Sequence, residues 1–154
     1  MRKELQAEAR KFGQMAEEVA AGYLLAEGYT IRERNWRPRN SHLEVDIIAE
    51  KNLTLIFVEV KARTGTLTDP LDAVDDKKIR KLVRAARIYM ASVAEPLDFR
   101  FDVITVIPAG NAENENEISD FARRFGPKLP PPTLTTDEYI LDHLPDAFLP
   151  PLGL

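Results

Sequence analysis

The sequence predicts an α/β domain, and three observations support this fold class. Two β-branched, apolar runs between Leu43 and Arg63 flank a short polar break at residues 50–52, a pattern typical of a β-hairpin. Before this hairpin, apolar residues recur at three- and four-residue spacing over residues 4–27, which predicts an amphipathic helix. After it come a helix with a basic face and a further strand, an order that allows a parallel crossover.

The first predicted helix covers residues 4–27 and ends at Gly28, where a glycine cap is expected. Its apolar stripe consists of Phe12, Met15, Ala16, Val19, Ala20, Tyr23 and Leu24. Glu17 lies one residue from this stripe, so it could border a site at the sheet. Spacing alone favours a solvent-facing helix flank for Glu17, because most helical glutamates face solvent.

A second predicted helix follows an N-cap at Asp75 or Asp76 and ends before Pro96. One of its faces is apolar, and the opposite face is the most basic segment of the chain. The cations on that face are Lys77, Lys78, Arg80, Lys81, Arg84 and Arg87. A charge run is usually a solvated face, but six cations without an acid among them are also consistent with a surface that contacts phosphates.

Residues 29–37 and 99–107 have the composition of further strands. In the first of them and just beyond it, Trp36 is interleaved with four cations, namely Arg32, Arg34, Arg37 and Arg39. These cations could contact phosphates while the indole packs or stacks. A solvated edge strand with a buried Trp explains the same pattern equally well.

The strand and helix patterns weaken after Pro108. Residues 111–117 are polar and acidic, Phe121 and Phe125 could dock a short helix, and 127–132 is a proline-rich linker. Residues 137–154 suggest one or two helical turns followed by an apolar, proline-rich end. We therefore divide the chain into a domain, residues 1–108, and an irregular, acidic, proline-rich C-terminal extension, residues 109–154, that packs on the domain or on a partner.

Composition places the chain among globular proteins and excludes several kinds of site. It has 154 residues, 44% hydrophobic and 30% charged, enough for one domain with a core. With no cysteine, disulfides and thiolate metal sites are excluded. No apolar run reaches the roughly 18 residues that span a bilayer, and the N-terminus lacks an apolar signal region. We expect a cytoplasmic protein that does not contact membranes.

The net charge of −4 does not by itself favour a nucleic-acid partner. The charge is unevenly distributed, however. Residues 1–95 carry 17 Lys and Arg against 15 Asp and Glu, whereas residues 96–154 carry 4 against 10. The acidity thus lies mainly in the last third, and a local basic surface remains compatible with the first part.

Three charged residues interrupt the apolar runs of the predicted hairpin. Asp46, Glu59 and Lys61 lie inside or at the end of strands that should otherwise be buried. Because an unpaired buried charge is costly, these residues must be paired, bound to a metal or facing a cleft. Side chains alternate along a strand, so pairing of the two strands can bring Asp46 and Glu59 together with Lys61 beside them. Two carboxylates and a lysine suit Mg²⁺ and an activated water.

Other catalytic chemistries find no support in the sequence. His42 and His143 are the two histidines, too few for a typical zinc site. A glycine-rich phosphate loop and a nucleophile elbow are both absent.

The residues in this order resemble the YraN family, small bacterial proteins of the PD-(D/E)xK nuclease superfamily that are similar to Holliday-junction resolvases. Asp46, followed thirteen residues later by Glu59-Val60-Lys61, resembles the superfamily signature. The wider matches are 16–24 (AEEVAAGYL), 28–29 (GY), 34–37 (RNWR), 44–49 (EVDIIA), 57–63 (FVEVKAR), 73–74 (AV) with Lys78, and 100–103 (RFDV). Together they cover about residues 13–107. Leu43 stands where the family usually has glycine.

The resemblance implies a restriction-endonuclease-like core with a central mixed β-sheet flanked by helices. It implies that Asp46, Glu59 and the Val60 carbonyl hold Mg²⁺ or Mn²⁺, and that Lys61 positions the attacking water. It also implies that Glu17 reaches the site, contrary to the interpretation from spacing alone. The resemblance and the basic run together suggest four substrate-binding cations, namely Arg34, Arg37, Arg63 and Lys78.

The expected function is metal-dependent hydrolysis of DNA phosphodiester bonds in repair or recombination. Branched, flapped or single-stranded DNA is the expected substrate by analogy with junction resolvases, and a homodimer would supply one site for each of two strands. Two alternatives remain open at this point: a non-catalytic module that binds nucleic acid or protein on a nuclease-like fold, and a nuclease acting on RNA.

Overall fold

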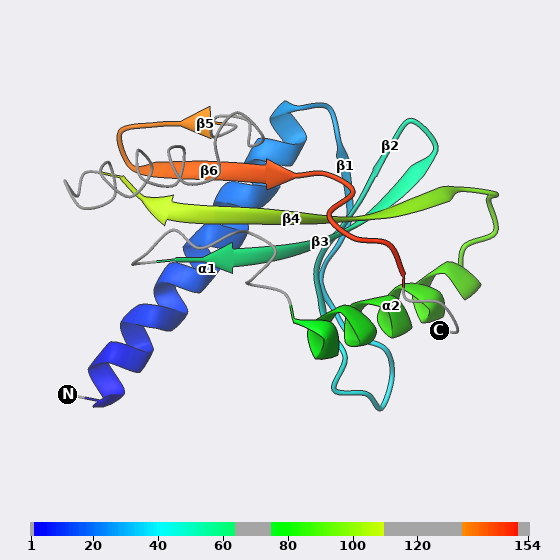
Figure 1. Cartoon of the computed structure of the whole chain (residues 1–154), viewed down its shortest axis with the longest axis horizontal. Helices are drawn as coiled ribbons and strands as arrows, with labels where there is room; N and C mark the ends of the chain where they lie inside the picture. Colours follow the sequence, from blue (N-terminus) through cyan, green and yellow to red (C-terminus); the bar gives the residue numbers. More distant parts are fainter. Residues whose placement is uncertain (1, 64–74, 110–133, 151–154) are drawn as a thin grey trace.

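The structure, a computed structural model, describes residues 2–63, 75–109 and 134–150. The elements are α1 (Arg2–Ala26), β1 (Thr30–Trp36), β2 (Val45–Lys51), β3 (Thr54–Ala62), α2 (Asp76–Ala91), β4 (Asp98–Pro108), β5 (Leu134–Thr135) and β6 (Tyr139–Leu144) (Figure 1). Neither helix that the structure describes is long and apolar enough to cross a membrane.

The six strands form one mixed sheet in the order β1-β2-β3-β4-β6-β5. β3 and β4 are parallel, and the chain between them contains α2. All other neighbouring strands are antiparallel. The predicted α/β class with a central mixed sheet is therefore confirmed, as are the hairpin of β2 and β3 and the parallel crossover through α2.

The two helices cover opposite faces of the sheet. Alternating residues of β3 show this division, because Phe57 packs in the core cluster that contains α2, whereas Ile56 and Val58 pack in the cluster that contains α1. α1 contributes small residues to its cluster, including Ala16 and Ala20, which are fully buried. The first ten residues of α1 are exposed, and this half of the helix extends beyond the sheet (Figure 1).

Local sequence signals set several element boundaries. Gly28 has a φ of 89° just after α1, a conformation that glycine adopts without strain. Asn52 and Leu53 both have positive φ, 51° and 61°, at the two-residue turn between β2 and β3, as a type I′ hairpin turn requires. Asp75 is the N-cap of α2, and its carboxylate accepts a hydrogen bond from the backbone nitrogen of Lys78 at 2.8 Å.

The C-terminal part differs from the sequence prediction. Residues 139–144 form strand β6 instead of helical turns, and this strand pairs with β4 along its whole length. Ile140 and Leu141 are consecutive and both buried, so the run has neither helical nor strictly alternating apolar spacing. Its conformation is set by pairing with β4, a partner that is distant in sequence. The predicted loop at 111–117, the helix around Phe121 and Phe125 and the linker at 127–132 lie outside the described residues.

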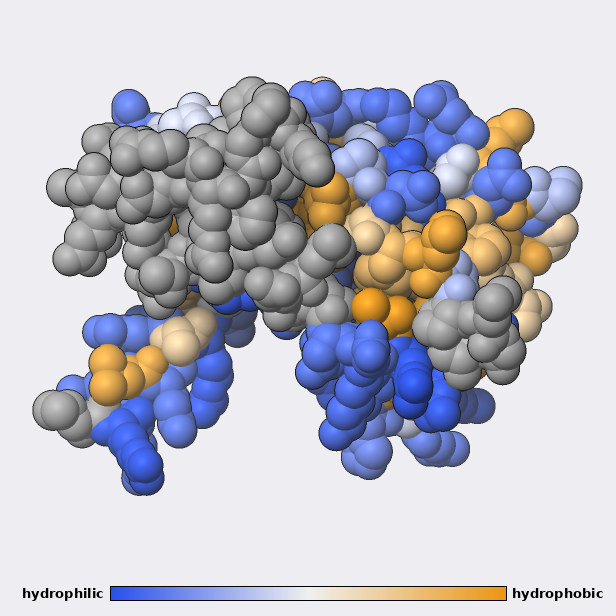
Figure 2. Space-filling model, viewed as in Figure 1, coloured by the Kyte–Doolittle hydropathy of each residue, from blue (hydrophilic) through white to orange (hydrophobic). Residues whose placement is uncertain are grey.

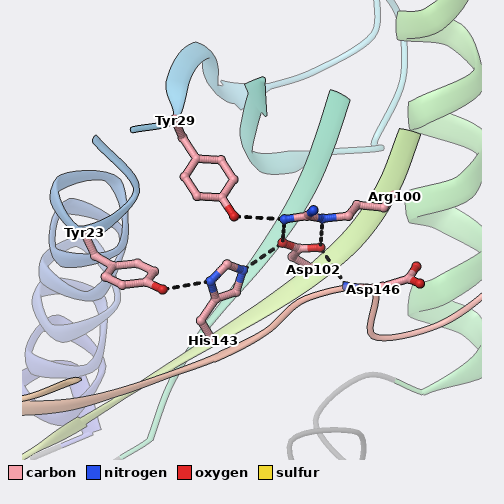
Figure 3. A network of polar contacts seen from close by, with 6 residues as sticks. All are labelled: Tyr23, Tyr29, Arg100, Asp102, His143 and Asp146. Atoms are coloured by element: carbon pink, nitrogen blue, oxygen red, sulfur yellow. Dashed lines mark hydrogen bonds and ion pairs between the residues drawn. The ribbon is translucent and has the colours of Figure 1, made fainter. Parts of the chain in front are cut away.

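A buried polar cluster attaches β6 to the rest of the domain (Figure 3). At its centre is Asp102 of β4, whose side chain is fully buried. The Arg100 guanidinium donates to both carboxylate oxygens of Asp102, at 3.0 and 3.1 Å, and the backbone nitrogen of Asp146 donates at 2.9 Å. His143 Nε2 of β6 lies 2.7 Å from Asp102 Oδ2, and His143 Nδ1 lies 3.0 Å from the Tyr23 hydroxyl of α1. Asp102 and His143 together thus join β4, β6 and α1.

Candidate active site

The predicted site residues lie where the pairing of three strands becomes irregular. β1 and β2 pair on both sides of Asn35 and Asp46, which occupy opposite positions. β2 and β3 pair up to Ile47 and Val58, so the next opposed positions are Asp46 and Glu59. Asn35 has a positive φ of 50°, outside the usual strand conformation. Asn35, Asp46 and Glu59 therefore form a row across the sheet at the end of its β2–β3 ladder.

The Asp46 side chain binds the strand it faces. Its Oδ2 accepts a hydrogen bond from the Val60 backbone nitrogen at 2.8 Å. A donor of β3 is thereby satisfied by a carboxylate just beyond the last β2–β3 backbone pair. This contact fixes Asp46 beside the residue that follows Glu59.

Glu59 is held between two lysines from different elements. Only 3% of its side chain is exposed, and its Oε1 lies 3.3 Å from Lys61 Nζ and 3.0 Å from Lys78 Nζ. Lys61 lies two residues along β3 on the same face, and Lys78 comes from the first turn of α2. Burial lowers the pKa of Lys78, but the charge and hydrogen bond of Glu59 outweigh it and raise the pKa. Both ammonium groups thus face a buried carboxylate.

Glu17 enters this region from α1 through a bridge made by Asn35. With the Asn35 amide nitrogen turned toward the carboxylates, it donates to Glu17 Oε2 at 3.2 Å and to Glu44 Oε1 at 3.1 Å. Burial raises the pKa of Glu17, and the charges of Glu44 and Glu59 add to this shift. The interpretation of Glu17 as a solvated flank, drawn from spacing alone, is wrong, because Glu17 points toward the row of polar residues on the sheet.

The pKa of Asp46 reports the concentration of negative charge. Burial is the largest cause that raises it, and the charges of Glu59 and Glu17 act in the same direction, whereas the Val60 hydrogen bond and Lys78 lower it. The net result is a pKa raised from 3.8 to about 7. Three carboxylates from α1, β2 and β3 therefore interact in one place. Mutual repulsion of this kind is reduced either by a proton or by a cation.

The donor set fits a hard divalent cation by its chemistry. Contacts with described residues engage Oδ2 of Asp46 and Oε1 of Glu59, so each of these carboxylates has a second oxygen outside those contacts. Within the described ranges, no three His, Asp or Glu side chains lie close enough to form a metal site by themselves. Mg²⁺ usually takes one or two carboxylates and retains several waters, so Asp46 and Glu59 suffice as protein anchors for Mg²⁺ or Mn²⁺.

The four cations predicted to bind substrate have different environments. Arg34 pairs with Glu18 at 2.8 Å, and Arg37 pairs with Glu44 at 2.8 Å. Lys78 contacts Glu59 inside the site. Arg63 directly follows β3, and its backbone nitrogen donates to the Val106 carbonyl at 2.9 Å, which continues the parallel ladder.

Trp36 packs in the core, since its ring meets Tyr89 of α2 edge-on with centroids 5.1 Å apart. β1 is an edge strand of the sheet, as one interpretation of the basic run around Trp36 expected, and contact of its arginines with phosphates stays a prediction.

A cleft lies beside Glu17, between α1 and β1. It has a volume of about 510 Å³ and is lined by Lys11, Gln14, Met15, Glu17, Glu18, Arg34 and Asn35. Neither Asn35 nor Glu44 was among the residues predicted from the sequence to act in the site. Glu44 shares the predicted strand with Asp46, which was an available signal. The role of Asn35 depends on its left-handed backbone and on contacts with α1, and neither feature is encoded by local spacing.

Comparisons with known proteins agree with the resemblance seen in the sequence. A model of Uncharacterised protein family UPF0102 matches residues 16–106. A UPF0102 protein of Bacteroides thetaiotaomicron is 40% identical over 147 residues, covering 95% of this chain and 98% of the relative. A UPF0102 protein of Phocaeicola vulgatus is 36% identical over 147 residues, which cover 95% of this chain and 98% of the relative. A UPF0102 protein of Chlorobium chlorochromatii is 46% identical over 112 residues, which cover 72% of this chain and 84% of the relative. The chain therefore belongs to family UPF0102, the YraN family.

Proposed function

We propose that this protein is a metal-dependent nuclease that hydrolyses phosphodiester bonds of DNA. The observation that carries the proposal is the row formed by Asp46 and Glu59, with Lys61 and Lys78 both on Glu59. A purely structural ion pair needs one lysine for one carboxylate. Here two lysines and at least two further carboxylates gather at one place, as expected of a site that handles a cation and a phosphate.

Each side chain of the site has a distinct role in this proposal. Asp46 and Glu59 hold the ion, with the Val60 carbonyl as a further ligand. When bound, Mg²⁺ or Mn²⁺ supplies a water of lowered pKa and polarises a phosphate oxygen. Lys61 orients the attacking water, and Lys78 offsets negative charge that develops on the phosphate. Glu17, fixed by Asn35, adds negative charge on the α1 side and favours cation binding.

The proposed substrate is branched, flapped or single-stranded DNA, and the proposed context is repair or recombination. A second site for a second strand would come from a homodimer. RNA shares the phosphodiester group that the site would attack, so the choice between the two nucleic acids needs a direct comparison.

The deciding experiment is cleavage of a labelled panel with Mg²⁺ or Mn²⁺ by the full-length chain. The panel contains a four-way junction, a flap, duplex DNA, single-stranded DNA and single-stranded RNA. Asp46→Asn and Lys61→Ala are compared with matched controls outside the site, Asp98→Asn at the start of β4 and Lys3→Ala on α1, both at exposed positions. We expect both site variants to lower the rate at least about 100-fold and both controls to leave it unchanged.

Two results would contradict this proposal. One is the absence of metal-dependent cutting of any substrate, and the other is cutting that survives both site substitutions. In the first case, nucleic-acid binding unaffected by either substitution would support the non-catalytic binding module instead.

A further inference from the structure

The solvent side of α2 carries a row of cations that acids of the described residues do not neutralise. The helix has six basic residues against one acid, Asp76, although the chain as a whole has a net charge of −4. Five of the six are exposed and form no ion pair with any acid in the described ranges, namely Lys77, Arg80, Lys81, Arg84 and Arg87. The sixth, Lys78, contacts Glu59 in the candidate active site. The cationic row therefore begins at the site itself.

Helical geometry divides these cations into a near and a far side. At 100° per residue, Lys81 lies about 60° from Lys78 around the helix axis, and Lys77 about 100°. Arg84 lies about 120° from Lys78, at the edge of this side, whereas Arg80 and Arg87 lie about 160° and 180° from Lys78. Arg87 accordingly lines a separate cavity of about 180 Å³ with Phe99, Phe101 and Pro150, among other residues. Lys77 and Lys81 thus border the active-site side of α2, whereas Arg80 and Arg87 face away from it.

The arginines in and directly after β1 are already paired with acids. Arg34 and Arg37 pair with Glu18 and Glu44 at 2.8 Å each, so a phosphate would have to compete with a carboxylate for either guanidinium. The exposed lysines on the near side of α2 face no such competitor among the described acids. Of the basic groups around the site, α2 therefore offers the most favourable electrostatic contact for an approaching polyanion.

The shape of the surface agrees with this placement. Strongly hydrophilic side chains gather where Figure 1 places α2, and the molecule is hollowed between α2 and the projecting N-terminal half of α1 (Figure 2). Residues of α1, β2, β3 and α2 supply the site, so the hollow lies between elements that carry it. A strand of nucleic acid lying along the near side of α2 would pass Lys78.

We infer that the near side of α2, with Lys77 and Lys81 as its exposed cations, binds the phosphodiester backbone of a nucleic acid and guides it to Glu59 and Lys61. The inference rests on the proposed function for the identity of the site, but it concerns binding alone. Contacts of this kind carry no base specificity, and each weakens as salt rises, because bound counterions are released from the nucleic acid.

The test compares two double variants that remove the same charge from the same helix. Lys77→Gln/Lys81→Gln removes the near pair, and Arg80→Gln/Arg87→Gln removes the far pair. Both are made in the full-length Asp46→Asn chain and studied with EDTA, which prevents cleavage during the measurement. The Asp46→Asn substitution also removes a carboxylate that would repel the nucleic acid when no metal is bound. Binding of single-stranded DNA, duplex DNA and single-stranded RNA is measured by fluorescence anisotropy from 50 to 200 mM salt.

Removal of the near pair, in Lys77→Gln/Lys81→Gln, should lower the affinity for nucleic acid at least about tenfold at the lowest salt. It should also reduce the slope of log affinity against log salt by about 0.7–0.9 for each lost contact. Removal of the far pair, in Arg80→Gln/Arg87→Gln, should change the affinity and the salt slope much less, although it changes the net charge by the same amount. Circular dichroism of both variants checks that α2 remains folded.

Equal effects of the two pairs would overturn the inference, since only the general charge of the helix would then matter. So would the absence of binding at 50 mM salt, or stronger binding to vesicles containing phosphatidylserine with the same dependence on Lys77 and Lys81. Failure of the proposed hydrolysis is distinguishable, because it would leave the contrast between the pairs intact while the cleavage panel shows no cutting.

Discussion

Asp46 and Asp102 are both withdrawn from solvent, yet their pKa values shift in opposite directions. Asp46 lies among other carboxylates, so burial, Glu59 and Glu17 raise its pKa to about 7. Burial also acts to raise the pKa of Asp102, but the hydrogen bonds from His143, Arg100 and the Asp146 backbone outweigh it and lower the pKa. The ionised form is thus stabilised by neighbours at Asp102 and destabilised at Asp46.

The shift at Asp46 predicts a pH dependence of stability. Because its pKa in the folded protein exceeds the ordinary value of 3.8, its stabilising contribution is complete below about pH 4 and is lost as pH rises through about 7. Without metal at pH 8, Asp46→Asn should therefore raise the free energy of unfolding by about 1–2 kcal/mol. Urea denaturation with EDTA at pH 5 and pH 8 measures this change, with Asp98→Asn as control. A gain that is equal at both pH values would contradict the assignment.

Asn35 allows a test of the bridge between α1 and the sheet. Its φ of 50° suits asparagine or glycine, so Asn35→Gly keeps the backbone conformation and removes only the amide that serves Glu17 and Glu44. We expect this variant to stay within about 1 kcal/mol of the wild-type stability. Metal-dependent cleavage should nevertheless fall about tenfold, because Glu17 loses its positioning contact. The control is Asn40→Gly, a second asparagine with positive φ and an exposed side chain. Unchanged cleavage by Asn35→Gly would show that the bridge is dispensable.

At the scale of elements, β6 depends on contacts that local sequence does not encode. The strand pairs with β4 from Val103 to Pro108, and its His143 meets Asp102, which is 41 residues away in the chain. The same histidine reaches Tyr23 of α1 across 120 residues. Burial raises the pKa of Tyr23 to about 12, so its hydroxyl stays protonated at neutral pH and can take part in this hydrogen bond. The helical turns predicted for this segment were wrong because these distant partners decide its conformation.

The two histidines provide a matched test of this attachment. His143→Ala leaves the fully buried Asp102 carboxylate without one of its hydrogen-bond partners and should lower the free energy of unfolding by about 2–3 kcal/mol. His42→Ala changes an exposed residue and should alter stability by less than about 0.5 kcal/mol. Urea denaturation at pH 7 measures both. Similar stability of the two variants would mean that the Asp102 cluster is not what fixes β6.

At the scale of the whole molecule, the boundary predicted after residue 108 cuts through the sheet. β5 and β6 extend the same sheet that contains the site strands, and the Ala109 backbone nitrogen donates to the Glu138 carbonyl at 2.9 Å. A chain ending at residue 108 would lose β6, His143 and the Asp146 backbone donor. The Asp102 carboxylate would then have fewer hydrogen-bond partners.

This geometry predicts opposite outcomes for two deletions. The chain 1–108 should unfold at much lower urea concentration than the full-length protein or aggregate on expression, because the edge of β4 is uncovered. Replacing residues 112–131 with a short Gly/Ser linker retains β5 and β6 and should keep the midpoint of unfolding close to that of the wild type. Size-exclusion chromatography and urea denaturation compare the two chains. A stable, monomeric 1–108 chain would show that the extension is not part of the folding unit.

The sequence predicted the parts of the fold that are specified locally. Gly28, the turn at Asn52 and the cap at Asp75 are each read from one or two residues, and Asp46, Glu59 and Lys61 from strand alternation in one hairpin. Contacts between distant elements were not predictable in this way, as the roles of Asn35 and His143 show. The orientation of Glu17 required the family resemblance, because helical spacing alone predicted the opposite side.

The Asp102 cluster is centred on strands β4 and β6, which carry none of the residues proposed to act on substrate. Every side chain proposed to act on substrate lies between residues 17 and 81, whereas the β4–β6 edge is secured through one carboxylate on the opposite side of β3. A relative can therefore differ in the sequence of its C-terminal strands and keep every residue of the site. Because any C-terminal segment must bring hydrogen-bond donors to the buried Asp102 carboxylate, we expect Asp102 to vary less among relatives than His143.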